Sequence, residues 1–281
     1  MDTVTPPDEI GKPYDEASRM ADIFNEGQEH LAYWYEYSDP ATVVEAGQRI
    51  TRKVAQALGL CSGERVLDAG CGVGAPGILV ASETGAQVTG ITISAAEATD
   101  AQDRARTAGL AGTAGLAGTA GLAGTARFER GDYQAMHFAD GYFDAIMAIE
   151  SMHHAPDVHR MLKEFSRVLR PGGRLAFSVC TREDPSAKIP DQFKSNILLT
   201  IPQWLDALES AGFAIEEYTQ CGPRVYGMGM RYLDHANELH DALVAKFGAD
   251  AISALKQGYR DMFAAGPRVI GYAIIAARKP D

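Results

Sequence analysis

One short stretch constrains the fold of this chain more than any other: an apolar run that leads directly into glycines and then into a helical pattern. Residues 65–69 (Arg-Val-Leu-Asp-Ala) are predicted to form a buried strand, residues 70–74 (Gly-Cys-Gly-Val-Gly) a tight turn, and residues 78–83 part of a helix. Glycines allow positive φ and close approach of a ligand, and a helix N-terminus offers unpaired N–H groups. The sequence therefore predicts a ligand-binding loop where a strand ends.

Strands and helices alternate beyond this loop. The further strands expected in the central part of the chain span 87–91, 127–130, 143–149 and 174–179. Ser94 is predicted to cap a helix that runs to about residue 106, and 158–169 form an amphipathic helix that ends before Pro171. Alternation of this kind is typical of parallel βαβ units. We therefore predict an α/β fold with a Rossmann-like, doubly wound sheet.

Both ends of the chain are predicted to add helices to this sheet. In the N-terminal part, helices are expected at 15–36 and from Asp39 to about Gly59, with Asp39 as N-cap and Pro40 in the first turn. In the C-terminal part, a helix at 202–211 and a strand at 213–218 precede two helical patterns and a last strand, which we expect to be antiparallel. These final elements span 230–246, 250–264 and 269–276.

This order of elements divides the chain into four parts. They are an N-terminal helical lid (1–60), the cofactor-binding core (61–222), a helical cap inserted before the last strand (223–266) and the final strand of the core (267–281). Within the core, residues 107–124 are three tandem copies of Thr-Ala-Gly-Leu-Ala-Gly, and a fourth begins at Thr125. Repeats so short and rich in glycine favour neither helix nor strand. We interpret 107–126 as an expanded loop, with a dedicated binding loop as the alternative.

Composition excludes several classes of function. The net charge of −11 and the pI of about 5.1 disfavour a nucleic-acid substrate, because an acidic protein repels the phosphate backbone. No apolar run is long enough for a membrane span, and the N-terminus lacks the pattern of a signal peptide. The four cysteines are widely separated, so we expect reduced thiols in a cytoplasmic protein and no metal site.

The glycine loop fits two kinds of cofactor. Gly72 to Gly77 match the GxGxxG pattern of dinucleotide-binding folds, which usually place an acid at the end of the second strand. That place is occupied by Thr92 and its apolar neighbours, which weakens the dinucleotide interpretation and also that of the second cofactor, S-adenosylmethionine, whose ribose is often bound by an acid there. The third strand instead leads into Asp132 and Tyr133, an acid that accepts a hydrogen bond from an adenine amino group and a ring that covers the base. An NAD(P)-dependent oxidoreductase is therefore the less favoured alternative.

Several motifs together resemble the class I S-adenosylmethionine-dependent methyltransferases. They are Asp68 to Gly74, Gly131-Asp132, Phe143-Asp144 and Leu169 to Gly173, in this order. The segments His30 to Trp34 and Glu150 to Asp157 resemble the small-molecule branch of that family, notably sugar O-methyltransferases of antibiotic biosynthesis such as the rebeccamycin enzyme. The resemblance covers about residues 10 to 281.

The resemblance implies S-adenosylmethionine as cofactor and a role for each matching residue. Gly70, Gly72 and Gly74 would contact the cofactor with support from Asp68. Thr92 would stand where relatives carry a ribose-binding acid, and Glu97 would supply the missing carboxylate. Asp132 would hold the adenine amino group and Tyr133 the ring. Tyr33 and Trp34 would come from the lid to cover the methionine end, with plain core packing as the alternative.

Methyl transfer mainly requires alignment of an acceptor with an activated donor. A hydroxyl acceptor also benefits from a base, and an imidazole suits that task. His153 and His154 occupy the place where the sugar O-methyltransferases carry a His pair; His154 is preferred as base, and packing is the alternative. Relatives support this base with an acid in the fifth strand, which is absent here, so Glu150 is the candidate support. Methylation of an amine is the alternative reaction. We expect a small-molecule acceptor, and a homodimer is the oligomer that we consider.

Overall fold

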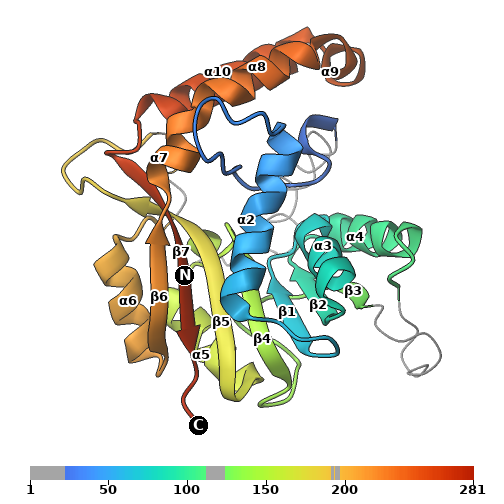
Figure 1. The fold of residues 1–281 in the computed structure, drawn as a ribbon, viewed down its shortest axis with the longest axis vertical. Coiled ribbons are helices and arrows are strands. Elements are labelled where there is room, and N and C mark those ends of the chain that lie inside the picture. Colours follow the sequence, from blue (N-terminus) through green and yellow to red (C-terminus); the bar gives the residue numbers. More distant parts are fainter. Residues whose placement is uncertain (1–22, 112–123, 191–192, 194–196) are drawn as a thin grey trace, which may run out of the picture.

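A seven-stranded sheet forms the centre of the molecule (Figure 1). The computed structural model describes residues 23–111, 124–190, 193 and 197–281. The strand order is β3-β2-β1-β4-β5-β7-β6, and β7 runs antiparallel to both of its neighbours. The strands are β1 (Arg65–Ala69), β2 (Gln87–Thr92), β3 (Thr125–Arg130), β4 (Phe143–Ile149), β5 (Leu169–Arg182), β6 (Ala214–Gln220) and β7 (Ile270–Arg278). The predicted Rossmann-like sheet with an antiparallel last strand is confirmed.

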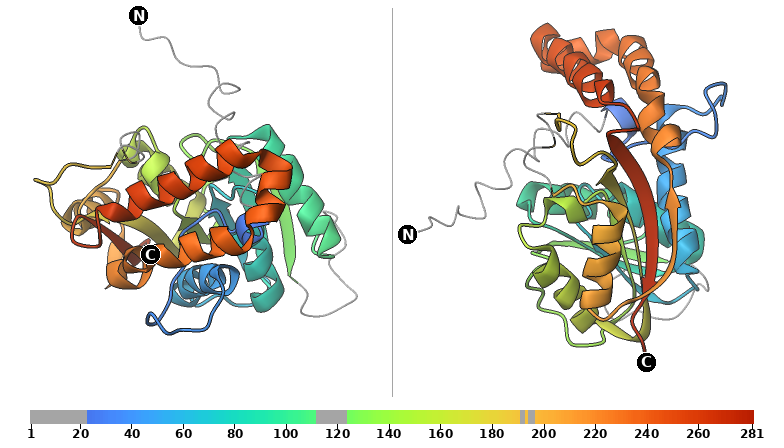
Figure 2. Two further views of the ribbon diagram at one scale, coloured as in Figure 1. Left: turned by 90° about the horizontal axis from the view of Figure 1, so that it is seen from above. Right: turned by 90° about the vertical axis from the view of Figure 1, so that its left-hand side faces the viewer.

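Helices cover both faces of the sheet. The right-hand view of Figure 2 shows α2 on one side and α5 and α6 on the other. The helices that pack with α2 into one core are α3 and α4, whereas α5 and α6 build the second core. Their bounds are α2 (Val43–Leu58), α3 (Ala75–Thr84), α4 (Ala95–Thr107), α5 (Val158–Val168) and α6 (Ile201–Ser210). Each core contains alternate side chains of the strands, as expected for a sheet buried on both faces.

The start of α2 differs from the prediction. The N-cap is Thr42, whose side chain accepts from the Glu45 N–H while the Glu45 carboxylate accepts from the Thr42 N–H. This capping box satisfies two backbone donors that a helix start leaves unpaired. The prediction of Asp39 as N-cap is wrong, because Asp39 accepts from the backbone of Tyr35 and pairs with Arg49. The predicted end is confirmed: Gly59 adopts a left-handed conformation after the last turn.

The first predicted helix ends earlier than expected. Residues 15–22 lie outside the described residues. From residue 23 onwards, helical conformation spans only 23–25, because Glu26 and Gly27 have φ of 54° and 80°. The chain then runs without regular structure to α2, and the prediction of a helix to residue 36 is wrong. Positive φ at two successive residues ends a right-handed helix.

The C-terminal helices lie above the sheet, over the N-terminal segment (Figures 1 and 2). They are α7 (Gly222–Val225), η3 (Tyr226–Met228), α8 (Gly229–Glu238), α9 (His240–Phe247) and α10 (Ala249–Ala264). The prediction of a single helix at 230–246 is therefore wrong. The helix is interrupted at Leu239, and α8 and α9 each pack on α10. Contacts to the N-terminal segment include Trp34 N–H donating to the Arg224 carbonyl at 3.1 Å.

The glycine repeat joins α4 to β3. Its central residues, 112–123, lie outside the described residues, so its predicted loop conformation is not described there. At its ends, the Ala126 N–H donates to the Leu110 carbonyl at 2.9 Å and Leu110 is buried. The two ends of the insertion therefore lie together beside the sheet. Within the described residues, no helix has the length and apolarity needed to cross a membrane.

The Phe128 ring fixes the packing around the glycine loop. A Cβ at Gly74 or Gly77 would lie 2.9 or 3.2 Å from this ring, and a Cβ at Gly90 would overlap it. Gly90 lies inside β2, where glycine commonly marks a close approach of another group. Phe128 in β3 therefore packs against both the loop and the neighbouring strand.

We expect Gly90→Ala to lower the free energy of unfolding by about 1–3 kcal/mol, because the added methyl group overpacks the site against Phe128. Thermal or denaturant unfolding of the cofactor-free protein measures this change. Gly258→Ala is the control: Gly258 lies in α10 with open space around it, so this variant should unfold at the same or a higher temperature. Equal stability of the Gly90→Ala protein and the wild type would contradict the packing described.

Candidate active site

A cavity of about 440 Å³ opens where β1, β2, β3 and β4 end. Its walls come from the glycine loop, from the residues that follow the other strands and from the N-terminal segment at residues 27–30. Most of the predicted site residues line it: Asp68, Gly70, Gly72, Thr92, Glu97, Asp132, Tyr133, Glu150 and His154. Four predicted residues do not line it: Gly74, His153, Tyr33 and Trp34.

The three glycines of the loop have different neighbours. Gly70, Gly72 and Gly74 have φ of 82°, 51° and 85°, which favour glycine. A Cβ at Gly70 would overlap Ser151, and one at Gly72 would overlap the Glu29 carboxylate. Because Gly70 and Gly72 have no side chain, their backbone forms the surface of the cavity at these positions. Gly74 instead permits the packing of α3, since a Cβ there would lie 2.8 Å from Ala101.

Asp68 lies beneath the loop. Its side chain is buried, its Oδ2 has no hydrogen-bond partner, and the first turn of α3 approaches it at Gly77. Burial raises the pKa of Asp68 to about 7, and the Gly77 N–H opposes part of that rise. A carboxyl that faces the N-terminus of a helix supports the conformation of the loop from below.

Thr92 and Glu97 meet as the sequence suggests. The Thr92 hydroxyl donates to the Glu97 carboxylate at 2.5 Å, and both side chains are buried in the cavity wall. Ser94, the predicted cap of α4, accepts from the Glu97 N–H at 3.1 Å. The first turn of α4 therefore carries the carboxylate that is absent at the end of β2.

Asp132 and Tyr133 follow β3 and line the cavity. Asp132 is exposed and accepts from the Gln134 N–H at 2.8 Å. The Tyr133 hydroxyl donates to the Ser151 carbonyl at 3.1 Å, and its ring meets Phe165 edge to face. This bond ties the residues after β3 to those after β4.

Glu150 is a strained and buried carboxyl at the end of β4. Its φ is 51°, which is uncommon for a residue with a side chain. The carboxylate accepts from the Leu31 N–H and from the Tyr272 hydroxyl, each at 2.7 Å, and Ser178 Oγ lies 3.0 Å from that hydroxyl. Burial raises the pKa of Glu150 to about 7. Strain held by several hydrogen bonds is a common property of functional sites.

The two histidines of the pair differ in their surroundings. His154 is exposed and lines the cavity, whereas His153 is 4% exposed and its Nδ1 has no hydrogen-bond partner. Burial lowers the pKa of His153 to about 3, so its ring is neutral. Both histidines belong to the short 3-10 helix η1 (Met152–His154), and their ring centroids lie 4.3 Å apart with an angle of 53° between the ring planes.

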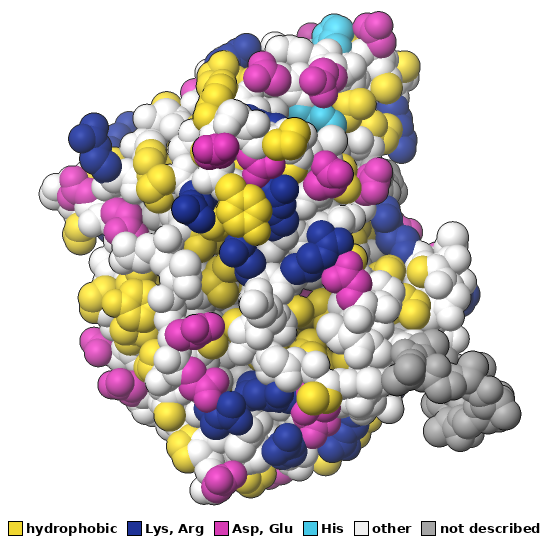
Figure 3. All heavy atoms as spheres, in the orientation of Figure 1, with side chains coloured by type: hydrophobic (Ala, Val, Ile, Leu, Met, Phe, Trp, Pro, Cys, Tyr) yellow, Lys and Arg dark blue, Asp and Glu magenta, His cyan; other side chains and the backbone are white. Residues whose placement is uncertain are grey.

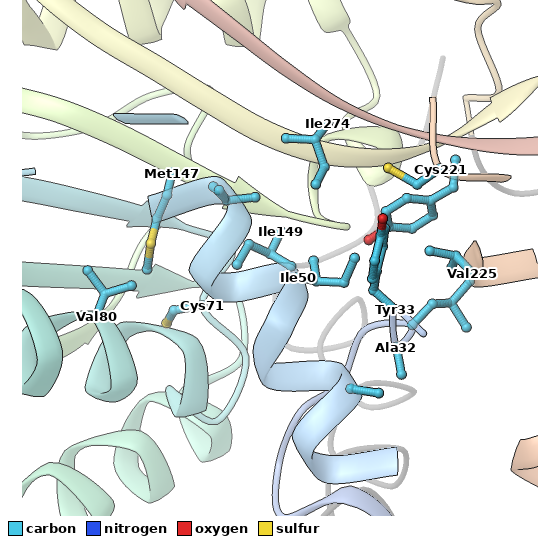
Figure 4. Close-up of a cluster of buried hydrophobic side chains, with 14 of the residues drawn as sticks. Ala32, Tyr33, Ile50, Cys71, Val80, Met147, Ile149, Cys221, Val225 and Ile274 are labelled. Atoms are coloured by element: carbon cyan, nitrogen blue, oxygen red, sulfur yellow. The ribbon is translucent and has the colours of Figure 1, made fainter. Parts of the chain in front are cut away.

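Tyr33 and Trp34 pack in the core and not in the cavity. Tyr33 lies among Ile50, Cys221 and Val225 (Figure 4), and its hydroxyl accepts from Arg224 at 2.6 Å. Trp34 is fully buried and donates from Nε1 to the Ala41 carbonyl at 3.0 Å. Their surroundings match the alternative of core packing.

The surface beside these rings carries several cations. Lys53 lies 4.5 Å from the centre of the Tyr33 ring, and Arg49 lies 4.8 Å from that of Tyr35. Figure 3 shows Lys and Arg gathered around exposed hydrophobic side chains on this face. The pairs join the N-terminal segment to α2 through cation–π contacts.

Sequence reasoning missed the N-terminal residues that do line the cavity. These are Gly27, Glu29 and His30, together with Ser151 beside Gly70. The segment from His30 to Trp34 carried part of the family resemblance, but its aromatic residues drew attention away from the acid before it. A segment without regular structure gives no periodicity from which its inward-facing residues can be deduced.

The cavity fits S-adenosylmethionine. Its volume lies within the range of roughly 300–1,000 Å³ common for small-molecule sites. The loop offers a wall without Cβ atoms at Gly70 and Gly72, and buried Asp68 Oδ2 has no partner within the protein. Among the described residues, no group of three or more His, Cys, Asp or Glu side chains is arranged to hold a metal.

Comparison with known proteins identifies the family. The methyltransferase domain model matches residues 67–177. Methyltransferase GfsG of Streptomyces halstedii is 32% identical over 280 residues, covering 97% of this chain and 94% of that protein. The 27-O-demethylrifamycin SV methyltransferase of Amycolatopsis mediterranei is 30% identical, covering 98% of each. The crystal structure of the [4+2]-cyclase SpnF superimposes with a TM-score of 0.80, at 27% identity and over 96% of this chain and 95% of that one. The chain therefore belongs to the S-adenosylmethionine-dependent methyltransferases.

Proposed function

We propose that this enzyme methylates a hydroxyl group of a small-molecule secondary metabolite, with His154 as the general base. One observation carries the proposal: of the two adjacent histidines, His154 faces the cavity and His153 is buried. An imidazole at the cavity is suited to accept the proton of an acceptor hydroxyl. The Amycolatopsis relative is a methyltransferase of 27-O-demethylrifamycin SV, which supports an oxygen acceptor.

Other residues of the cavity are proposed to bind the cofactor and to align the acceptor. When bound, S-adenosylmethionine supplies an electrophilic methyl group. The backbone of Gly70 and Gly72 would allow the cofactor to approach the loop closely, and Thr92 and Glu97 would bind its ribose. Asp132 would accept from the adenine amino group. The acceptor would enter beside His154, and alignment of its oxygen is the main catalytic task.

Glu150 is proposed to support the base. The fifth strand carries no acid over residues 177–180, but its Ser178 is linked to Glu150 through the Tyr272 hydroxyl. An amine acceptor needs less help from a base, so N-methylation is the alternative reaction. SpnF, which shares this fold, is a [4+2]-cyclase, so an assay for methyl transfer distinguishes the proposed reaction from a cyclisation. A homodimer and a cytoplasmic location stay predictions.

We expect Asp132→Asn to weaken the binding of S-adenosylhomocysteine about tenfold, because an ionic hydrogen bond to the adenine amino group becomes a neutral one. Isothermal titration calorimetry measures this affinity. Asp100→Asn, an exposed change on α4 away from the cavity, is the control and should bind as the wild type does. Unchanged affinity of the Asp132→Asn protein would remove Asp132 from the cofactor site.

We expect His154→Ala to lower kcat by about 100-fold on a hydroxyl acceptor found by screening natural-product scaffolds, because the general base is lost. The affinity for S-adenosylhomocysteine should stay unchanged. His159→Ala, an exposed histidine on α5, is the control and should keep full activity. If screening yields only amine acceptors and His154→Ala methylates them at the wild-type rate, the alternative reaction replaces the proposal.

We expect the stability of the cofactor-free protein to depend on pH through Glu150. A carboxyl with a higher pKa in the folded state makes that state bind more protons, so the free energy of unfolding falls as pH rises from 4.5 towards 7. Glu150→Gln keeps an acceptor oxygen without the charge. The variant should match the wild type near pH 4.5 and be more stable by up to about 3 kcal/mol near pH 8.

Thermal unfolding of both proteins across this pH range measures the difference. Asp68, whose pKa is also raised, is present in both proteins, so its contribution cancels in the comparison. A difference in stability that does not change with pH would contradict the assignment of a raised pKa to Glu150.

A further inference from the structure

One carboxylate on the cavity wall has no role in the function proposed above. Glu29 belongs to the N-terminal segment, and its Oε2 accepts from the Val73 N–H at 3.2 Å. A Cβ on Gly72 would overlap this oxygen. The Glu29 carboxylate therefore lies directly on the glycine loop, in contact with a position where a larger residue would displace it.

The backbone on both sides of Glu29 is held in place. On one side, Gly27 has φ of 80° and turns the chain towards the loop. On the other, the His30 ring is buried within 2.9 Å of Gln28 Oε1 and 3.0 Å of the Leu31 carbonyl oxygen. The Leu31 N–H then donates to Glu150. The position of Glu29 is thus set by the same hydrogen bonds that join this segment to the sheet.

The cavity wall has a pronounced charge pattern. The carboxylates that line it are Glu29, Asp68, Glu97, Asp132 and Glu150, and among the residues that the structure describes no Lys or Arg belongs to the lining. The lining also includes two histidines, His30 and His154. Burial lowers the pKa of His30 to about 4, so its ring is neutral near pH 7. Such a wall favours a cationic ligand.

The carboxylates are distributed along the cavity. Glu97 and Asp132 follow β2 and β3, on the side assigned to the adenosine portion, and Asp68 lies beneath the loop. Glu150 is engaged by Leu31 and Tyr272. Asp132 follows β3, whereas Glu29 lies on the glycine loop after β1, two strands away in the sheet and at the loop end of the cavity. That end would receive the amino-acid portion of the cofactor, which carries an ammonium group.

We propose that Glu29 binds the α-ammonium group of the cofactor's amino-acid end. The proposal rests on the placement of the adenosine portion beside Asp132 and is independent of the acceptor and of the base. Glu29 then determines which adenosine derivatives bind well. Derivatives whose 5′ substituent carries an ammonium group are favoured over those whose 5′ substituent lacks it.

Two probes that differ in this end test the proposal. S-adenosylhomocysteine carries the ammonium group, and 5′-methylthioadenosine lacks the whole amino-acid portion. For Glu29→Gln, calorimetry should show S-adenosylhomocysteine binding about tenfold weaker than to the wild type and 5′-methylthioadenosine binding unchanged, because an ion pair with hydrogen-bond geometry is lost for the first probe alone. Glu36→Gln, a change in the same segment at an exposed side chain, should leave both affinities unchanged.

Each other outcome overturns the proposal and points to a different cause. Equal weakening of both probes would show that Glu29 acts by shaping the loop. Unchanged affinity would remove it from the site. Tighter binding of S-adenosylhomocysteine would show that Glu29 competes with the ligand for the Val73 N–H. If wild-type protein binds neither probe, the cofactor placement itself fails, whereas loss of methyl transfer with these affinities intact concerns the proposed acceptor chemistry alone.

Discussion

The structure depends on the narrow path of the backbone after β1. Between Asp68 and α3 the chain must turn under Glu29, beside Ser151 and over Phe128, and each of these neighbours stands where a Cβ would otherwise lie. Glycine at 70 and 72 brings the main chain to the cavity surface, while glycine at 74 allows α3 to close on α4. The cavity exists because these side chains are absent and the surrounding sheet keeps the gap from collapsing.

A second constraint joins parts of the chain that are far apart in sequence. At the end of β4, the Glu150 carboxylate accepts hydrogen bonds from the Leu31 N–H of the N-terminal segment and from the Tyr272 hydroxyl of β7. One buried group at the end of β4 therefore joins the segment that carries Glu29 to the last strand. The left-handed backbone at Glu150 is retained because these bonds fix it from several sides.

Burial separates chemically identical residues into different roles. His153 and His154 are adjacent, yet one is enclosed as a neutral ring and the other meets the cavity. Five carboxylates share one wall, but Asp68 and Glu150 have raised pKa values because they are desolvated, while Asp132 is exposed. A cationic ligand would offset the cost of ionising the two buried acids, so the acidity of the wall is consistent with the cofactor of this family.

Local patterns in the sequence determined the strands, the glycine loop and the cap at Ser94, because each depends on residues a few positions apart. Contacts between distant segments decided the rest. The sequence carried no sign that Glu29 would lie on Gly72 or that the Leu31 N–H would donate to Glu150. These positions follow from an N-terminal segment without regular structure, whose side chains are oriented by tertiary packing and not by a repeating backbone geometry.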